Sequence, residues 1–330
     1  MNRRIEAIIC GVVLYLPHIL LAAEEEKTVV AAKTSTLSTA ELVSSFTTAS
    51  FFSPVTFYRI QLGDKDSATG MAAGDDSEFE TVSFSVTPTI ATIDNNVEPI
   101  LVSGDVSLAI FGVESFNELD MIAKGVTLTL DRTSVTSTEV VAGGPNTSSA
   151  VSGNGWTIAP YYVKQLENGY LMDINSGYGK NSLKTSSGGV TATPDSTRMF
   201  VSVGLSTTET ISDSVYLQYK GAASYTYDRV GSYVQSDNST VAASTTKLNQ
   251  LRLGATVSKQ MENVVPFVSG TIISNSFSAS GGSGTQPREH SFTTLMKVGF
   301  NFSHDLIYGS LAFQSERDKN STQFYIGYRF

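Results

Sequence analysis

The last eight residues of the chain carry the pattern that most constrains its fold. They end the sequence as Gln-Phe-Tyr-Ile-Gly-Tyr-Arg-Phe, and Phe324, Ile326, Tyr328 and Phe330 occupy every second position. In a β-strand this period places all four apolar side chains on one face. The strand that closes a transmembrane barrel needs such a face, because one side of it meets lipid. The segment therefore predicts a closing barrel strand; the alternative is an edge strand of an ordinary sheet.

This ending resembles the C-terminal signature of Gram-negative outer-membrane proteins. The resemblance implies that Phe324, Ile326, Tyr328 and Phe330 form an assembly signal. It implies two kinds of protein partner, the barrel assembly machinery and periplasmic chaperones, besides the lipid bilayer itself. The expected localisation is the cell outer membrane.

The beginning of the chain predicts export. Arg3 and Arg4 precede an apolar run from Ile8 to Leu21, and Ala23 offers a small residue for cleavage. These features predict a secretory signal peptide over residues 1–23. The alternative is a membrane anchor helix, but the run has about 14 residues and a helical span needs roughly 20.

Composition narrows the class further. Hydrophobic residues make up 41% of the chain and charged residues 16%, with a net charge of −9. An acidic protein of this kind is not expected to bind nucleic acid. Cys10 is the one cysteine and belongs to the predicted signal peptide, so disulfides and cysteine-ligated metals are excluded from the mature chain.

Alternating apolar and polar residues fill positions 79–330, which predict an all-β domain. The expected architecture is a transmembrane antiparallel up-and-down β-barrel of about 12 strands. The predicted strands centre on residues 82–86, 102–110, 126–130, 156–162, 172–174, 199–205, 215–227, 251–257, 265–273, 296–302, 307–313 and 324–330. Trp156 and the tyrosines are expected to lie at the membrane interface.

The opposite face of these strands carries charges in mid-strand. In the predicted barrel this face lines the lumen, so five residues are expected to line the pore: Asp105, Asp173, Lys220, Arg252 and Lys297. For the second strand this phase directs Val106, Leu108 and Ile110 toward lipid.

Loop lengths alternate in the way that outer-membrane barrels require. Short connections are predicted at 165–169, 207–213, 260–263 and 303–305, on the periplasmic side. Long connections rich in Ser, Thr and Gly are predicted at 131–154, 180–197, 230–246 and 274–290, facing the exterior. The alternation of short and long connections fails near residues 94–96, where a long connection is expected and the sequence allows only a short one.

Three segments resemble the β-barrel domain of autotransporters, the type V secretion family. They are Gly155–Tyr162, the segment Asn168–Gly179 that ends in Gly-Tyr-Gly, and Val265–Gly270. The resemblance implies a 12-stranded barrel, a helix within the pore and an N-terminal passenger. The chain departs from it because only about 55 residues separate Ala23 from the first barrel strand, too few for a β-helical passenger.

Residues 24–78 form a separate region, a linker that is either a pore helix or a vestigial passenger. Ser38 and Glu41 have the spacing of a capping box, which predicts a short helix over Thr39–Ala49. Asp64 and Asp66 do not match a calcium-binding loop, so the linker is expected to bind no metal.

No enzymatic activity or cofactor is expected. The two histidines of the mature chain, His290 and His304, are predicted at opposite ends of the barrel and so cannot share a catalytic site. Three functions remain open: an autotransporter-like translocator with its N-terminal segment in the pore, a porin-like passive channel, and a structural or adhesive surface protein.

Overall fold

The computed structural model describes residues 80–97, 100–117, 119–139, 147–281, 288–304, 306–316 and 319–330. The predicted signal peptide, the segment 24–78 and its helix over Thr39–Ala49 lie outside the described residues. Within these ranges no helix is long and apolar enough to cross a membrane.

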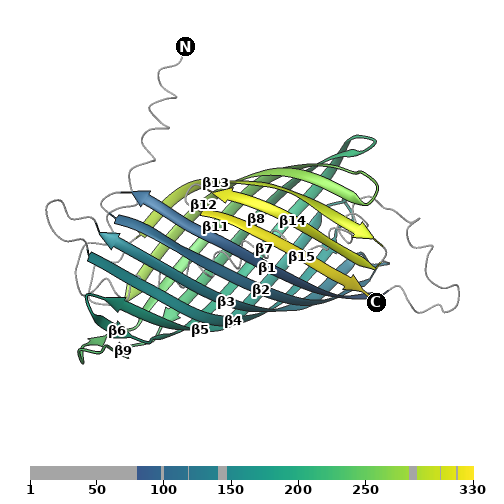
Figure 1. Ribbon diagram of the computed structural model, residues 1–330. Helices are drawn as coiled ribbons and strands as arrows, with labels where there is room; N and C mark the ends of the chain where they lie inside the picture. Colours follow the sequence, from purple (N-terminus) through teal and green to yellow (C-terminus); the bar gives the residue numbers. More distant parts are fainter. Residues whose placement is uncertain are drawn as a thin grey trace, which may run out of the picture.

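Twelve long antiparallel strands form one closed sheet (Figure 1). They are β1 (Glu80–Val97), β2 (Ile100–Asn117), β3 (Ile122–Glu139), β4 (Thr147–Gln165), β5 (Leu171–Ser187), β7 (Asp195–Ser212), β8 (Val215–Val230), β11 (Ser244–Lys259), β12 (Val264–Gly281), β13 (Arg288–His304), β14 (Ile307–Glu316) and β15 (Lys319–Arg329). Three short strands lie between them: β6 (Val190–Ala192), β9 (Tyr233–Val234) and β10 (Thr240–Val241). Each long strand pairs with the next along the chain, and β1 pairs with β15 to close the barrel. The predicted fold class and strand number are confirmed.

The seam between β1 and β15 joins the two ends of the sheet. Phe84 lies opposite Tyr328, and Val86 opposite Ile326. The backbone amide of Phe330 donates a hydrogen bond to the carbonyl of Val82 at 3.0 Å, which pins the last residue of the chain. The C-terminus therefore lies at one end of the barrel, opposite the end that carries β6 and β9 (Figure 1).

An apolar belt surrounds the outside of the barrel, because alternate residues on each strand are large, apolar and exposed. Members of this belt include Val82, Phe84, Val126, Leu128, Ile158, Val201, Val203, Leu251, Leu253, Val298, Phe324 and Ile326. In water such a surface would be unfavourable, and in a bilayer it matches the hydrocarbon. The alternation that predicted lipid-facing side chains is thus confirmed for ten of the strands; β2 is the exception, and the sequence of β12 gave no clear phase.

The predicted long loops proved mostly to be strand. β3 continues to Glu139 and β4 begins at Thr147, so most of the 131–154 segment is paired. β5 and β12 likewise extend to Ser187 and Gly281. Strands of 16 to 19 residues exceed the roughly 9–11 that a tilted span needs. The extensions lack an apolar face because they project beyond the membrane, which is why the sequence pattern suggested loops.

Candidate functional site: the barrel lumen

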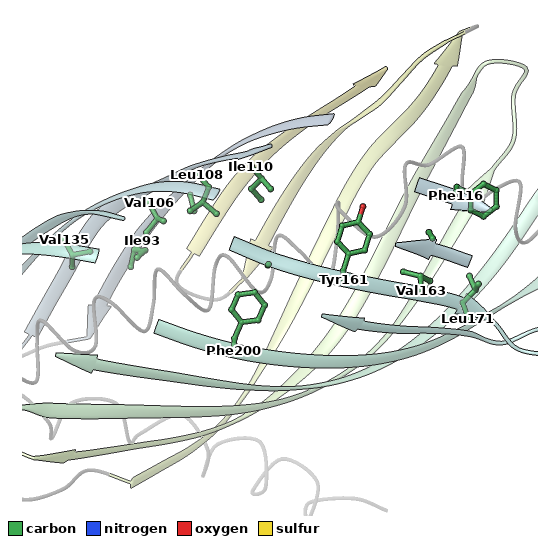
Figure 2. Close-up of a cluster of buried hydrophobic side chains, with 13 residues drawn as sticks. Ile93, Val106, Leu108, Ile110, Phe116, Val135, Tyr161, Val163, Leu171 and Phe200 are labelled. Carbon is green, nitrogen blue, oxygen red and sulfur yellow. The ribbon is translucent and has the colours of Figure 1, made fainter. Parts of the chain in front are cut away.

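The lumen surface carries a cluster of apolar side chains on the inward faces of β1 to β5, which also carry polar residues such as Thr89, Thr129 and Asp131. Together with Phe200 of β7, the members of this cluster are Ala91, Ile93, Val106, Leu108, Ile110, Phe116, Ala123, Val135, Ala159, Tyr161, Val163 and Leu171. Figure 2 shows the larger of these spread along neighbouring strands, from Val135 and Ile93 at one end to Phe116 and Leu171 at the other. We call this surface the apolar wall. A lumen that held only water would be lined by polar groups throughout.

The apolar wall corrects the predicted phase of β2. Val106, Leu108 and Ile110 point inward and are almost fully buried, whereas Asp105 and Ser107 are exposed on the outer face. Asp105 therefore does not line the lumen, and its predicted pore-lining position is wrong. β2 carries apolar residues on its inward face, and its outward Asp105 lies opposite Ser134 and Thr92, beyond the apolar belt. The rule that apolar side chains face lipid therefore assigned the two faces of β2 the wrong way round.

The remaining lumen surface, from β5 through β15, carries most of the buried polar side chains, besides apolar ones such as Leu248 and Ile273, and we call it the polar wall. A row of hydrogen-bonding side chains crosses five of its strands in register: Asn175, Ser202, Ser224, Gln250 and Asn275. Gln250 donates to Asn275 at 2.8 Å. The amide of Asn175 and the hydroxyls of Ser202 and Ser224 are buried without a hydrogen-bond partner. Such groups are costly unless something pairs with them, so this row can bind polar groups that enter the lumen.

Arg198 and Asp131 form a buried ion pair across the lumen wall. The guanidinium of Arg198 on β7 donates to both carboxylate oxygens of Asp131 on β3, at 2.9 and 3.2 Å, and neither side chain is exposed. Two strands, β4 and β5, separate the partners. The bidentate geometry is the strong form of this interaction and fixes β3 relative to β7.

Gly155 on β4 provides space for this bridge, and Gly177 on β5 provides space for the ring of Phe200. A Cβ at Gly155 would lie 2.7 Å from Asp131 Oδ1 and 3.0 Å from Arg198 Nη2. A Cβ at Gly177 would collide with the ring of Phe200. These glycines belong to the segments that carry the predicted autotransporter resemblance, and here they let long side chains lie flat against the wall.

Three cations of the polar wall lie near the middle of the barrel. Lys220 Nζ is 3.1 Å from Asp173 Oδ1, so this pair is neutral overall. Arg252 donates to Gln250 Oε1 at 2.9 Å. Lys297 is buried, and its contacts within the described residues are neutral: Gln323 Oε1 at 3.5 Å and the Phe267 ring at 5.7 Å. The carboxylate of Asp228 is also buried on this wall, so cations and carboxylates share it.

A second buried polar group lies near the seam, at the C-terminal end of the barrel. The hydroxyl of Tyr161 donates to Glu114 Oε2 at 2.7 Å. Across the seam, the rings of Tyr308 and Tyr325 pack at 5.7 Å, and Arg329 lies 5.7 Å from the Tyr308 ring. The first contact joins β2 to β4 and the others join β14 to β15, so each braces the sheet on its own side of the seam.

The predicted site residues fall on two surfaces. Asp173, Lys220, Arg252 and Lys297 lie on the inward face, although their role in a conducting pore stays a prediction. Phe324, Ile326, Tyr328 and Phe330 all point outward on the closing strand. Their role as an assembly signal stays a prediction too.

The two histidines are both exposed and both on β13. His290 lies near its start and His304 is its last residue, at opposite ends of the barrel as predicted. That the chain is not an enzyme stays a prediction.

Sequence reasoning missed Arg198, Asp131, Glu114 and Tyr161. Asp131 fell in a predicted loop, and Arg198 lay just outside one. A signal was present, because Arg198 shares its phase with Ser196, Ser202 and Ser206, which face the lumen. Pairing across two intervening strands cannot be deduced from alternation, so the partner could not be named.

Comparisons with known proteins agree with this geometry. No family model matches the chain, and no curated protein matches it either. Solved structures do match. The translocator domain of the autotransporter NalP from Neisseria meningitidis superposes with a TM-score of 0.61 at 12% identity, covering 91% of this chain and 99% of that one. The transport unit of the autotransporter AIDA-I from Escherichia coli gives 0.53 at 10% identity, covering 83% and 95%.

A third structure, the β-domain of the Bordetella autotransporter BrkA, gives a TM-score of 0.51 at 14% identity, covering 77% of this chain and 99% of that one. At such identities the likeness concerns the fold. The chain is thus a transmembrane β-barrel of the outer-membrane type, with the fold of autotransporter translocator domains.

Proposed function

We propose that this protein is an autotransporter-like translocator barrel of the outer membrane whose own N-terminal segment, residues 24–78, occupies the lumen. The apolar wall is the observation that carries the proposal. Val106, Leu108 and Ile110 point into the barrel. Facing water, this surface would be unfavourable, and a chain segment lying against it would remove the cost.

The sequence of the N-terminal segment matches a lumen with two unlike walls. In a helix over Thr39–Ala49, Leu42 and Val43 would both lie next to Phe46, since they precede it by four and three residues. The face they form suits the apolar wall. Glu41 would be available to the cations Lys297 and Arg252 on the polar wall. A helix this short needs such support, because it is unstable alone in water.

Single-channel conductance in planar bilayers tests this function. The full mature chain is expected to conduct little, and a variant that lacks residues 24–50 is expected to conduct several-fold more. Both should show the same gel shift between unheated and boiled samples, which reports a folded barrel. A variant with Leu42→Asn and Phe46→Asn should have a conductance between those of the full chain and the deletion variant. Equal conductance of the full chain and the deletion variant, with both folded, would contradict the proposal.

The second candidate is a porin-like passive channel. The row of unpaired polar groups at Asn175, Ser202 and Ser224 favours it, because water and polar solutes could satisfy them. In that case the full chain itself would conduct well, and the charged residues of the lumen would set a weak ion selectivity. The same measurement separates the two candidates.

A further inference from the structure

The outer surface of the barrel changes character at a pair of aromatic residues. Trp156 on β4 and Tyr178 on β5 pack edge to face, with ring centroids 6.3 Å apart, and both are exposed on the outer face. Toward the C-terminal end of the barrel the outward residues include the apolar Ile158 and Ile174, with Ser176 between Ile174 and Tyr178. Away from it they are polar, beginning with Asn154 and Lys180. Aromatic pairs of this kind mark the level of lipid head groups.

Five cations lie on the outer face at or just beyond this level. We call them the basic band: Arg132 of β3, Lys180 and Lys184 of β5, Arg229 of β8 and Lys247 of β11. All five side chains are exposed, and their sequence neighbours on the same strands are buried in the lumen. The basic band therefore points toward the membrane surface and not into the barrel.

Strand register brings three members of the basic band together. Lys180 lies opposite Thr197, and Thr197 lies opposite Arg229, so one strand separates the two cations. At the usual strand spacing they are about 10 Å apart. Lys247 lies opposite Tyr227, two residues from Arg229 on the same face. Lys180, Arg229 and Lys247 thus form a patch of three cations beside an aromatic side chain.

The basic band has no matching set of carboxylates on the protein. The ion pairs of the described residues join other side chains: Arg198 with Asp131, Lys220 with Asp173, and Lys319 with Glu316. Three carboxylates, those of Asp94, Asp105 and Asp195, are exposed in this region, and Asp105 lies opposite Ser134, two residues from Arg132. Asp94 and Asp105 belong to β1 and β2, so among the described residues the patch of Lys180, Arg229 and Lys247 has one exposed carboxylate beside it, that of Asp195.

We propose that the basic band binds the phosphate groups of glycolipids in the outer leaflet of the membrane. Lysine and arginine beside a membrane gain energy from anionic head groups, and arginine binds phosphate with two hydrogen bonds. The aromatic pair places the band at head-group height, where lipid phosphates lie. The choice of leaflet rests on the proposed orientation, with the C-terminus in the periplasm.

The opposite end of the barrel supplies a matched control. Lys164 of β4 and Lys259 of β11 are also exposed on the outer face, but they lie at the strand ends nearest the C-terminus. A variant that carries Lys180→Gln, Arg229→Gln and Lys247→Gln removes the patch. A variant that carries Lys164→Gln and Lys259→Gln removes charge of the same sign elsewhere.

The test measures binding of purified full-length barrel to lipid A in mixed detergent micelles, with bis-phosphorylated and dephosphorylated lipid A compared. We expect the wild type to prefer the phosphorylated form. The triple variant should lose at least about tenfold in affinity for it, while the control variant stays within about twofold. All three proteins must show the gel shift of a folded barrel.

Retained affinity in the triple variant, an equal loss in the control variant, or equal binding of dephosphorylated lipid A would overturn the proposal. The measurement requires no conductance and no N-terminal plug. Failure of the proposed translocator function would therefore leave its result unaffected.

Discussion

Arg198 and Asp131 are joined by two hydrogen bonds of 2.9 and 3.2 Å although the strands that carry them, β7 and β3, are not neighbours. The bridge crosses β4 and β5 over Gly155, where a larger residue would not fit. Both side chains are fully buried. The pair therefore clamps the middle of the sheet from inside, where the apolar belt cannot act.

Breaking this bridge should destabilise the barrel. Arg198→Met takes the bidentate partner from a buried carboxylate, and such changes cost about 3–5 kcal/mol. The double variant Arg198→Met/Asp131→Leu should cost less, because no charge loses its partner. Urea unfolding in lipid vesicles measures both. The half-exposed pair Lys319 and Glu316 is the comparison: Lys319→Gln should cost less than about 1 kcal/mol. If Arg198→Met alone lost no more stability than the double variant, the ion pair would not act as a clamp.

Gly179 should not tolerate alanine. Its added Cβ would collide with the carbonyl oxygen of Trp156 on the neighbouring strand. Backbone atoms cannot move aside as a flexible side chain can, so we expect a loss of about 1–3 kcal/mol. At Gly270 the nearest atom to an added Cβ is the Met296 sulfur, at 3.6 Å, and alanine there should be nearly neutral. Equal unfolding midpoints for the two alanine variants would show that the close approach has no energetic effect.

Removing Phe330 should impair assembly in cells. Phe330 is 70% exposed and packs edge to face on Tyr328, with ring centroids 5.1 Å apart. Its amide also bonds to Val82 at the seam. Deletion removes both the aromatic contact and the residue that resembles an assembly signal. The fraction of folded protein in the outer membrane should fall several-fold, whereas Phe292→Ala, at another exposed aromatic, should leave it unchanged. Similar losses in both variants would point to general lipid contact and not to a terminal signal.

The orientation of the barrel can be checked by cysteine labelling on intact cells. Ser239 lies between β9 and β10 at the end away from the C-terminus, and Asn168 lies in the turn between β4 and β5 at the other end. A cysteine at position 239 should react with a membrane-impermeant thiol reagent. A cysteine at position 168 should react only after the outer membrane is opened. The reverse pattern would show that the C-terminus faces the exterior.

The sequence predicted the barrel because its membrane-facing surface obeys a local rule. Phe324, Ile326, Tyr328 and Phe330 alternate as lipid requires, and the structure places all of them outward. The alternation of apolar and polar residues misled the prediction at positions that lie outside the lipid bilayer. Asp105 lies beyond the belt, so its polar character said nothing about the lumen, and Val106 beside it faces inward.

The lumen was predictable only in part, for a related physical reason. Asp173, Lys220, Arg252 and Lys297 lie on the inward face, as alternation indicates for their strands, and their role in lining a pore stays a prediction. Alternation does not fix which inward residues meet. The bridge from Arg198 to Asp131 depends on strand register and on the space above Gly155. Both arise only when the sheet closes.

Disulfide cross-linking between the N-terminal segment and the apolar wall tests the central claim most directly. Cys10 belongs to the predicted signal peptide, so a mature chain with Phe46→Cys and Leu108→Cys would hold two cysteines. If the N-terminal segment occupies the lumen, a disulfide should form in the folded barrel and be seen as faster migration on non-reducing gels. None should form in the variant with Phe46→Cys and Ile158→Cys, because Ile158 faces lipid. A folded barrel that forms no disulfide between positions 46 and 108, or forms both equally, would contradict a lumen occupied by the N-terminal segment.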